Sequence, residues 1–221
     1  MPGKLIVIEG TDGSGKTVQT NKLVERLQAE GHTVKTLSFP TYGKESAKAV
    51  ELYANGEFGK DVDPYFSAML YAHNRKEETQ EMQEDLAQGT HYIVNRYTSA
   101  NAGHQAGKLP KEQRADFVTW LEDLEYERLG IPRPDCVIFL HVPPAIGQQL
   151  VEQKPPEERT YLKGATKDIH EADLQHLENA EAAFIQAAEQ LGWTTIECAT
   201  PELRSIEAIH EDLYAILKPL L

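Results

Sequence analysis

Cysteine is scarce in this sequence. The 221 residues include two cysteines, Cys136 and Cys198, and each lies within an apolar run. Two isolated cysteines do not supply the ligands of a structural zinc site, and a free thiol in apolar surroundings behaves as a small hydrophobic side chain. We therefore expect two buried free thiols and a reducing compartment, the cytoplasm.

Positive charge and long apolar runs are lacking as well. Lys and Arg number 22 against 35 Asp and Glu, which gives a formal net charge of −13. This balance argues against a nucleic acid or an anionic membrane as the main partner, so local positive groups must hold any bound phosphate. The apolar stretch at the start of the chain is too short for a signal peptide, and no later stretch approaches the roughly 20 apolar residues of a membrane span. We expect a soluble protein.

Short apolar runs rich in β-branched residues alternate with helix-patterned segments. The runs lie at residues 4–9, 33–39, 91–95, 136–142 and 194–198. Helices are predicted at residues 17–30, 44–55, 64–88, 98–107, 111–129, 144–153, 168–191 and 204–218. Strands that alternate with helices favour a parallel sheet covered on both faces, and this length suits one domain. We predict a single three-layer α/β domain, residues 1–221, with a five-stranded parallel sheet flanked by helices.

The segment GTDGSGKT matches the phosphate-loop pattern G-x-x-x-x-G-K-[ST] in full. It follows an apolar strand and opens a helix, which is the order that the motif requires. Its glycines let backbone N–H groups converge on one anion at a helix N-terminus. Its lysine can reach the β- and γ-phosphates, and its last hydroxyl can bind Mg²⁺. We predict a P-loop fold in which ATP is bound by Gly10, Thr11, Asp12, Gly13, Ser14, Gly15, Lys16 and Thr17.

Asp12 is unusual inside a phosphate loop, because a carboxylate repels polyphosphate unless it has a separate role. One interpretation is that Asp12 forms the turn. The other is that Asp12 faces the acceptor, where it accepts a hydrogen bond from a sugar hydroxyl or holds a water bound to Mg²⁺. Both interpretations remain open from the sequence.

Two further places in the sequence indicate a second ligand. Phe39 and Pro40 follow the second predicted strand, at the edge where open α/β folds bind ligands. Tyr71 and Arg75 are four residues apart and share a face of a predicted helix, so the ring can stack on a base while the guanidinium meets a polar edge or a phosphate. The alternative for this pair is a core aromatic beside a solvated arginine.

Taken together, these features make the sequence resemble the thymidylate kinase family. The resemblance covers residues from about 4 to 190 in the order of the family. It rests on EGTDGSGKT, on Phe39-Pro40, on Tyr71 to Arg75, on Arg96-Tyr97 with Asn101 and Gln105, and on the segment KDIHEADL.

The resemblance implies an enzyme that uses ATP and Mg²⁺ to phosphorylate dTMP, giving dTDP and ADP. The catalytic residues that it implies are Lys16, Asp12, Arg96 and Arg159. It implies Arg96 at the acceptor phosphate and Tyr71 against thymine, within a dTMP site formed by Asp12, Phe39, Pro40, Tyr71, Arg75, Arg96, Asn101, His104 and Gln105. His104 stands where the family often has a tyrosine that disfavours a 2′-hydroxyl, which leaves sugar discrimination open. The family is typically homodimeric, and this implies a homodimer to which helix 64–88 contributes.

The polar loop EQKPPEERTYLKGATKD, residues 152–168, resembles the family's lid over ATP. The family takes basic residues for phosphate either from the phosphate loop or from the lid. Position 13 is glycine here, so the lid must supply them, and Arg159 is the first candidate before Lys163 and Lys167. The alternative is a solvated basic loop. Asp168, His170 and Glu171 follow as helix-capping groups, or in the case of Glu171 as a residue near the metal.

Asn95 departs from the family, which usually has aspartate before Arg-Tyr. An amide oxygen can accept a hydrogen bond there but brings no negative charge. We predict Thr17 as a Mg²⁺ ligand and Asn95 as a ligand through water, with Asp12 or Glu171 offsetting the lost charge. Two alternatives stay open: a kinase for another pyrimidine monophosphate or a deoxynucleoside, and, because of this departure, a nucleotide-binding protein without catalysis.

Overall fold

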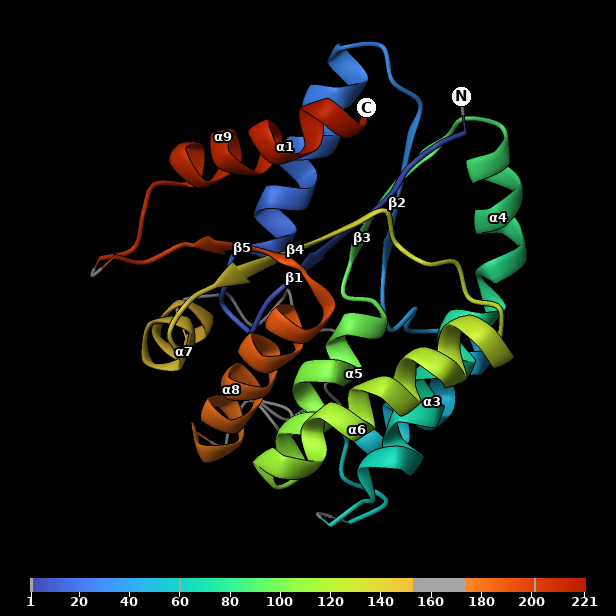
Figure 1. Ribbon diagram of the computed structural model, residues 1–221, viewed down its shortest axis with the longest axis vertical. Helices are drawn as coiled ribbons and strands as arrows, with labels where there is room; N and C mark the ends of the chain where they lie inside the picture. Colours follow the sequence, from blue (N-terminus) through green and yellow to red (C-terminus); the bar gives the residue numbers. More distant parts are fainter. Residues whose placement is uncertain (1, 60, 153–173, 201) are drawn as a thin grey trace.

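The structure is a computed structural model that describes residues 2–59, 61–152, 174–200 and 202–221. Its centre is a sheet of five parallel strands in the order β2-β3-β1-β4-β5 (Figure 1). The strands are β1 (Leu5–Glu9), β2 (Val34–Ser38), β3 (His91–Asn95), β4 (Cys136–His141) and β5 (Thr194–Glu197). This confirms the predicted five-stranded parallel sheet, and each strand lies within its predicted range.

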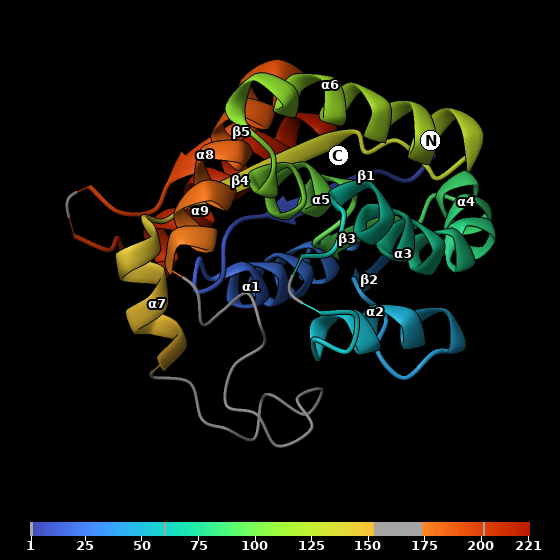
Figure 2. The ribbon, with the colours of Figure 1, turned by 90° about the horizontal axis from the view of Figure 1, so that it is seen from below.

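Helices cover both faces of the sheet. The α-helices of the described residues are α1 (Lys16–Ala29), α2 (Lys48–Ala54), α3 (Pro64–Glu77), α4 (Thr79–Ala87), α5 (Thr98–His104), α6 (Lys111–Glu122), α7 (Pro144–Glu152), α8 (Leu174–Leu191) and α9 (Ile206–Leu217). α1 and α9 pack together on one face, while α5, α6 and α8 pack together on the other (Figure 1). The view in Figure 2 has α6 on one side of β1 and α1 on the opposite side.

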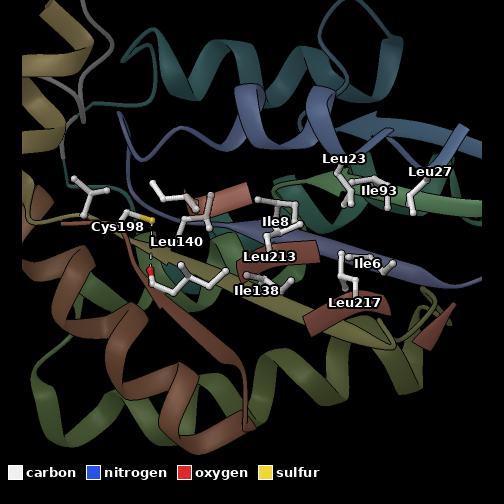
Figure 3. Close-up of a cluster of buried hydrophobic side chains, with 13 residues drawn as sticks. Ile6, Ile8, Leu23, Leu27, Ile93, Ile138, Leu140, Cys198, Leu213 and Leu217 are labelled. Atoms are coloured by element: carbon white, nitrogen blue, oxygen red, sulfur yellow. Dashed lines mark hydrogen bonds between the residues drawn. The ribbon is translucent and has the colours of Figure 1, made fainter. Parts of the chain in front are cut away.

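The core follows from the central position of β1. All five residues of this strand are buried, as an uninterrupted apolar run requires when a strand is covered on both faces. Ile6 and Ile8 pack with α1 and α9, whose contribution includes Leu23, Leu27, Leu213 and Leu217 (Figure 3). Leu5 and Val7 join a second cluster on the other face, as the two-residue period of a strand dictates.

The predicted helix 64–88 is wrong as a single element, because α3 ends at Glu77 and α4 begins at Thr79. The residue between them, Glu78, is buried. Its carboxylate pairs with Lys44 at 2.5 Å, and its ψ of −8° departs from helical geometry. The helical apolar pattern continues across this break, so the sequence carries no sign of it.

The predicted helix 111–129 also changes character along its length. α6 ends at Glu122, and residues Asp123–Arg128 form a π-helix. A π-helix is rare, and it occurs often at functional sites. Its wider turn includes Glu125, whose side chain is fully buried. Shorter 3₁₀ turns replace parts of other predicted helices at Glu45–Ala47, Ala106–Lys108 and Lys218–Leu220.

Residues 153–173 lie outside the described part of the chain. The predicted lid therefore lies almost entirely outside it, together with Arg159, Lys163, Lys167, Asp168, His170 and Glu171. Both cysteines are free thiols: Cys198 is buried, as expected, while Cys136 is only partly buried because it begins β4. Among the helices described, none is long and apolar enough to cross a membrane.

Candidate active site

The phosphate loop joins the buried end of β1 to the start of α1. Gly13 and Gly15 have positive φ angles of 83° and 86°, which residues with a side chain rarely adopt. The Lys16 Nζ donates to the carbonyl oxygens of Gly10 and Thr11, each at 2.9 Å. The loop therefore holds the ammonium group close to its own backbone, where a bound phosphate would meet it.

Glu9 links this loop to α5 through two hydrogen bonds. Its side chain is fully buried. One carboxylate oxygen accepts a hydrogen bond from the Gly10 amide at 3.0 Å, and the other accepts one from the Ser99 hydroxyl at 2.7 Å. The end of β1 and the first turn of α5 are thereby held in a fixed relation.

Gly13 has no room for a side chain. A Cβ at this position would lie 2.2 Å from the carbonyl oxygen of Gly147 in α7. A Cβ on Gly147 would in turn lie 2.6 Å from the carbonyl oxygen of Asp12. The loop and α7 thus approach each other backbone to backbone. This contact explains why position 13 carries no basic side chain.

Asp12 contacts the arginine that the resemblance implies at the acceptor phosphate. Its carboxylate forms an ion pair with Arg96, the residue that follows β3. Burial raises the pKa of Asp12, but the charges of Arg96 and Lys16 outweigh burial and hold this pKa well below its ordinary range. Asp12 is therefore ionised at neutral pH.

Arg96 occupies a strained backbone position with a φ of 62°. Its Nη2 pairs with Asp12, and its Nη1 lies 2.7 Å from Nε2 of His104. Burial lowers the pKa of Arg96, while the carboxylates of Asp12 and Glu9 raise it above its ordinary value. The guanidinium is thus a fixed positive charge beside the phosphate loop.

Arg75 is buried, so the alternative interpretation of a solvated arginine is wrong. The guanidinium is 1% exposed and forms a bidentate pair with Glu125, with Nε and Nη2 at 2.6 and 2.5 Å from the carboxylate oxygens. Asn101 donates to the same carboxylate at 3.1 Å. Glu125 of the π-helix therefore holds two predicted acceptor-site residues, Arg75 and Asn101, in place.

Tyr71 and Gln105 lie in one neighbourhood with Tyr53. The rings of Tyr53 and Tyr71 meet edge to face, with centroids 6.1 Å apart. The Gln105 Oε1 accepts hydrogen bonds from Ser67 at 2.7 Å and from Tyr53 at 3.5 Å. On the other side of the site, Phe39 is buried and its peptide bond to Pro40 is cis.

Thr17 and Asn95 meet between the phosphate loop and β3. The Asn95 Nδ2 donates to the Thr17 hydroxyl at 3.4 Å. The Asn95 Oδ1 is buried and has no hydrogen-bond partner in the described chain. An unpartnered amide oxygen beside a threonine hydroxyl fits Mg²⁺, which prefers oxygen ligands and keeps several of its waters. Among the described residues, no group of three or more His, Cys, Asp or Glu could hold a metal by itself.

Most of the predicted site residues line one cavity of about 590 Å³. Of the predicted site residues within the described chain, Gly10 and Thr11 do not line it. The others that the cavity brings together are Asp12, Gly13, Ser14, Gly15, Lys16, Thr17, Phe39, Pro40, Tyr71, Arg75, Asn95, Arg96, Asn101, His104 and Gln105.

Comparison with known proteins gives a consistent result. The sequence model of the family described as thymidylate kinase matches residues 8–212. A thymidylate kinase of Mycobacterium tuberculosis is 31% identical over 192 residues, which cover 86% of this chain and 87% of that protein. The human thymidylate kinase is 30% identical over 214 residues, with 96% and 88% covered. The chain belongs to the thymidylate kinase family.

A solved thymidylate kinase from Candida albicans has the same fold, with a TM-score of 0.71 at 21% identity over 99% of this chain and 92% of that one. Membership of the thymidylate kinase family confirms the predicted enzyme class, a nucleoside monophosphate kinase. It also confirms the predicted function, ATP-dependent phosphorylation of dTMP. The individual roles of the site residues stay predictions.

The cavity extends beyond the residues that the sequence singled out. It is also lined by Gln19, Leu203, Arg204 and Ile206. The Gln19 side chain donates to the carbonyl oxygen of Ile206 at 2.9 Å, which ties α1 to the start of α9. Arg204 and Ile206 follow β5 at the same carboxyl edge as the phosphate loop. Their position after a predicted strand was the sequence feature that could have indicated a place in the site.

Proposed function

We propose that this chain binds ATP on the phosphate loop and dTMP between Arg96, Arg75 and Tyr71, and transfers the γ-phosphoryl group to the dTMP phosphate. One observation carries the proposal: Arg96 pairs with Asp12 of the phosphate loop itself. The fixed positive charge for an acceptor phosphate therefore lies beside the place where the donor phosphates bind.

Positioning and charge neutralisation carry such a transfer, because little covalent chemistry falls to the protein. The loop amides and Lys16 hold the donor phosphates, and Arg96 holds the acceptor phosphate so that one of its oxygens faces the γ-phosphorus. That oxygen forms the new P–O bond while the bond to the β-phosphate oxygen breaks, which gives dTDP and ADP. Mg²⁺, held by Thr17 and through water by Asn95, would neutralise charge on the donor phosphates.

The acceptor base is recognised on the side of Tyr71 and Gln105. Because the Gln105 Oε1 accepts from Ser67 and Tyr53, its amide N–H groups remain as donors. A donor at this place suits the keto oxygen of thymine and does not suit the amino group of cytosine. Tyr71 stacks on the base, and Phe39 with Pro40 forms the opposite wall.

The basic residues for the transferred phosphate come from the lid, about residues 152–168 of the single domain 1–221. Arg159 is the first candidate, with Lys163 and Lys167 behind it. The backbone contact between Gly13 and Gly147 supports this choice, because it prevents the phosphate loop from carrying a long side chain at position 13. Closure of such a lid keeps water away from the γ-phosphate.

The enzyme acts as a homodimer in the reducing cytoplasm. α3 exposes Phe66 and Met69, which are 49% and 53% exposed, and the ring of Phe58 packs on Phe66. Exposed apolar side chains that form one contiguous patch are typical of a protein interface. The two free thiols support the compartment.

A panel of acceptors tests the function. The purified chain is incubated with ATP, Mg²⁺ and, in separate reactions, dTMP, dCMP, dUMP, thymidine and deoxycytidine, and the products are separated by chromatography. We expect dTDP to form fastest. Preferred turnover of dCMP or of a deoxynucleoside would establish the alternative acceptors, and tight ATP binding without any product would establish a nucleotide-binding protein without catalysis.

A further inference from the structure

Arg96 is held from two sides. Asp12 engages Nη2, and the imidazole of His104 meets Nη1 with 2.7 Å between Nη1 and Nε2. Arg96 also has a positive φ of 62°, so its backbone is strained and its direction depends on such contacts. If Asp12 acted alone, it would draw the guanidinium toward the phosphate loop. His104 supplies the opposing contact.

This contact requires one particular form of His104. A guanidinium carries only donors and stays protonated. The Nε2 of His104 must therefore accept the hydrogen bond, which places the imidazole in the neutral form with its proton on Nδ1. A protonated His104 has no acceptor to offer, and it brings a second positive charge next to Arg96.

α8 holds the imidazole in place from the other side. The ring of His176 stacks on His104 with centroids 6.1 Å apart and planes 13° apart, and the edge of Phe184 meets it at 5.2 Å. α8 approaches this closely because Gly103 has no side chain: a Cβ there would lie 2.3 Å from the Phe184 ring. The described charged and titratable groups around the contact are Asp12, Lys16, Glu9, Arg96, Tyr42, Tyr71 and His176.

We infer that neutral His104 is a positioning residue that aims Arg96 at the acceptor phosphate, and that protonation of His104 releases Arg96. The inference rests on the proposed role of Arg96 as the anchor of dTMP. Arg96 has five N–H donors, of which Asp12 and His104 take two, so a dianionic phosphate finds donors whose directions are already set. Loss of this alignment weakens dTMP binding and leaves ATP binding unchanged.

Steady-state kinetics across pH 5.5 to 8.5 tests the inference with three variants. In the wild type, KM for dTMP should rise as pH falls, while KM for ATP stays level. His104→Gln keeps an acceptor oxygen but does not titrate, so its KM for dTMP should rise much less at acid pH. His104→Phe keeps the ring contacts but lacks an acceptor, so its KM for dTMP should be raised about tenfold or more at every pH. His32→Gln, at the opposite end of the sheet, should follow the wild type.

The tautomer itself gives a reading that does not depend on turnover. In ¹⁵N NMR of the labelled imidazoles at pH 8, we expect His104 to carry its proton on Nδ1, with assignment by comparison with His104→Gln. A proton on Nε2 would overturn the inference, and so would an acid rise in KM that persists unchanged in His104→Gln. Absence of dTMP turnover by the wild type at any pH would instead overturn the proposed function.

Discussion

The Oδ1 of Asn95 is buried without a hydrogen-bond partner in the described chain. Such an atom costs free energy unless a ligand or water satisfies it. Its proximity to Thr17 therefore supports a role in holding a hydrated cation when nucleotide is bound.

We predict that Asn95→Asp changes the magnesium dependence of the reaction. A carboxylate at this position adds a negative charge next to Thr17, so half-maximal activity should require a lower Mg²⁺ concentration. A titration of activity with Mg²⁺ at saturating ATP and dTMP measures the shift. Identical titration curves for the two proteins would remove Asn95 from the metal environment.

Motifs allowed most residues of the cavity to be predicted, and two residues that they did not indicate have separate causes. The phosphate loop, Arg96 and Arg75 belong to patterns of fixed spacing. Glu125, which pairs with Arg75, belongs to no such pattern, because a π-helix shifts the register and turns an ordinary acidic position inward. Arg204 was missed because the phosphate loop lies far from it in sequence and near it only in the fold.

At the scale of elements, the phosphate loop depends on its contact with α7. We predict that Gly13→Ala lowers stability by about 1 to 3 kcal/mol and weakens ATP binding, because the new Cβ meets the Gly147 backbone. Gly15→Ala is the matched control: Gly15 has nearly the same φ, but a Cβ there meets nothing within 4 Å. Urea unfolding and calorimetric ATP titration measure both effects. Equal losses in the two variants would mean that backbone strain, and not the contact with α7, is responsible.

His141, the last residue of β4, connects this strand with β5 and α8. Its imidazole lies 2.6 Å from a Glu197 oxygen of β5 and 2.8 Å from a Glu181 oxygen of α8. Burial lowers the pKa of His141, but the hydrogen bonds with Glu181 and Glu197 outweigh burial and raise it above the ordinary value. A raised pKa in the folded state means that the protonated form is the stabilising one.

The pH dependence of this stabilisation follows from the sign of the shift. The contribution of His141 is fully present below the unfolded pKa of about 6.5 and disappears as the pH rises through the folded pKa. We predict that His141→Gln lowers the free energy of unfolding more at pH 6 than at pH 9. Urea denaturation at the two pH values measures the difference, and an equal loss at both would contradict a charged His141.

Strand and helix ranges were predictable where the sequence has a clear apolar run, as in β1, or a regular helical pattern, as in α1. The break at Glu78 was not predictable, because the apolar pattern runs through it and only the tertiary contact with Lys44 accompanies it. The same holds for the close approach of α5 to α8. Gly103 reads as an ordinary glycine in the sequence, and only the packing of Phe184 shows why a side chain is excluded there.

At the scale of the whole molecule, the exposed face of α3 tests the proposed homodimer. We predict that the wild type has twice the chain mass of 24.8 kDa in solution, and that Met69→Glu shifts it toward the monomer by placing a charge in the interface. Size-exclusion chromatography with light scattering measures the mass. Ile185→Glu, at another exposed apolar side chain, should remain dimeric, and a monomeric wild type would contradict the proposal.

A competition experiment tests which nucleotide this enzyme prefers as acceptor. Equimolar dTMP and dCMP compete for limiting ATP and Mg²⁺ in one reaction, and the diphosphates are quantified at low conversion, with Lys16→Ala as the inactive control. We predict that dTDP exceeds dCDP at least about tenfold, because in the proposed site the Gln105 amide would donate to the keto oxygen that thymine has where cytosine has an amino group, and that ADP equals the sum of the two. Equal amounts of the two diphosphates, an excess of dCDP, or unimpaired dTDP formation by Lys16→Ala would contradict the account.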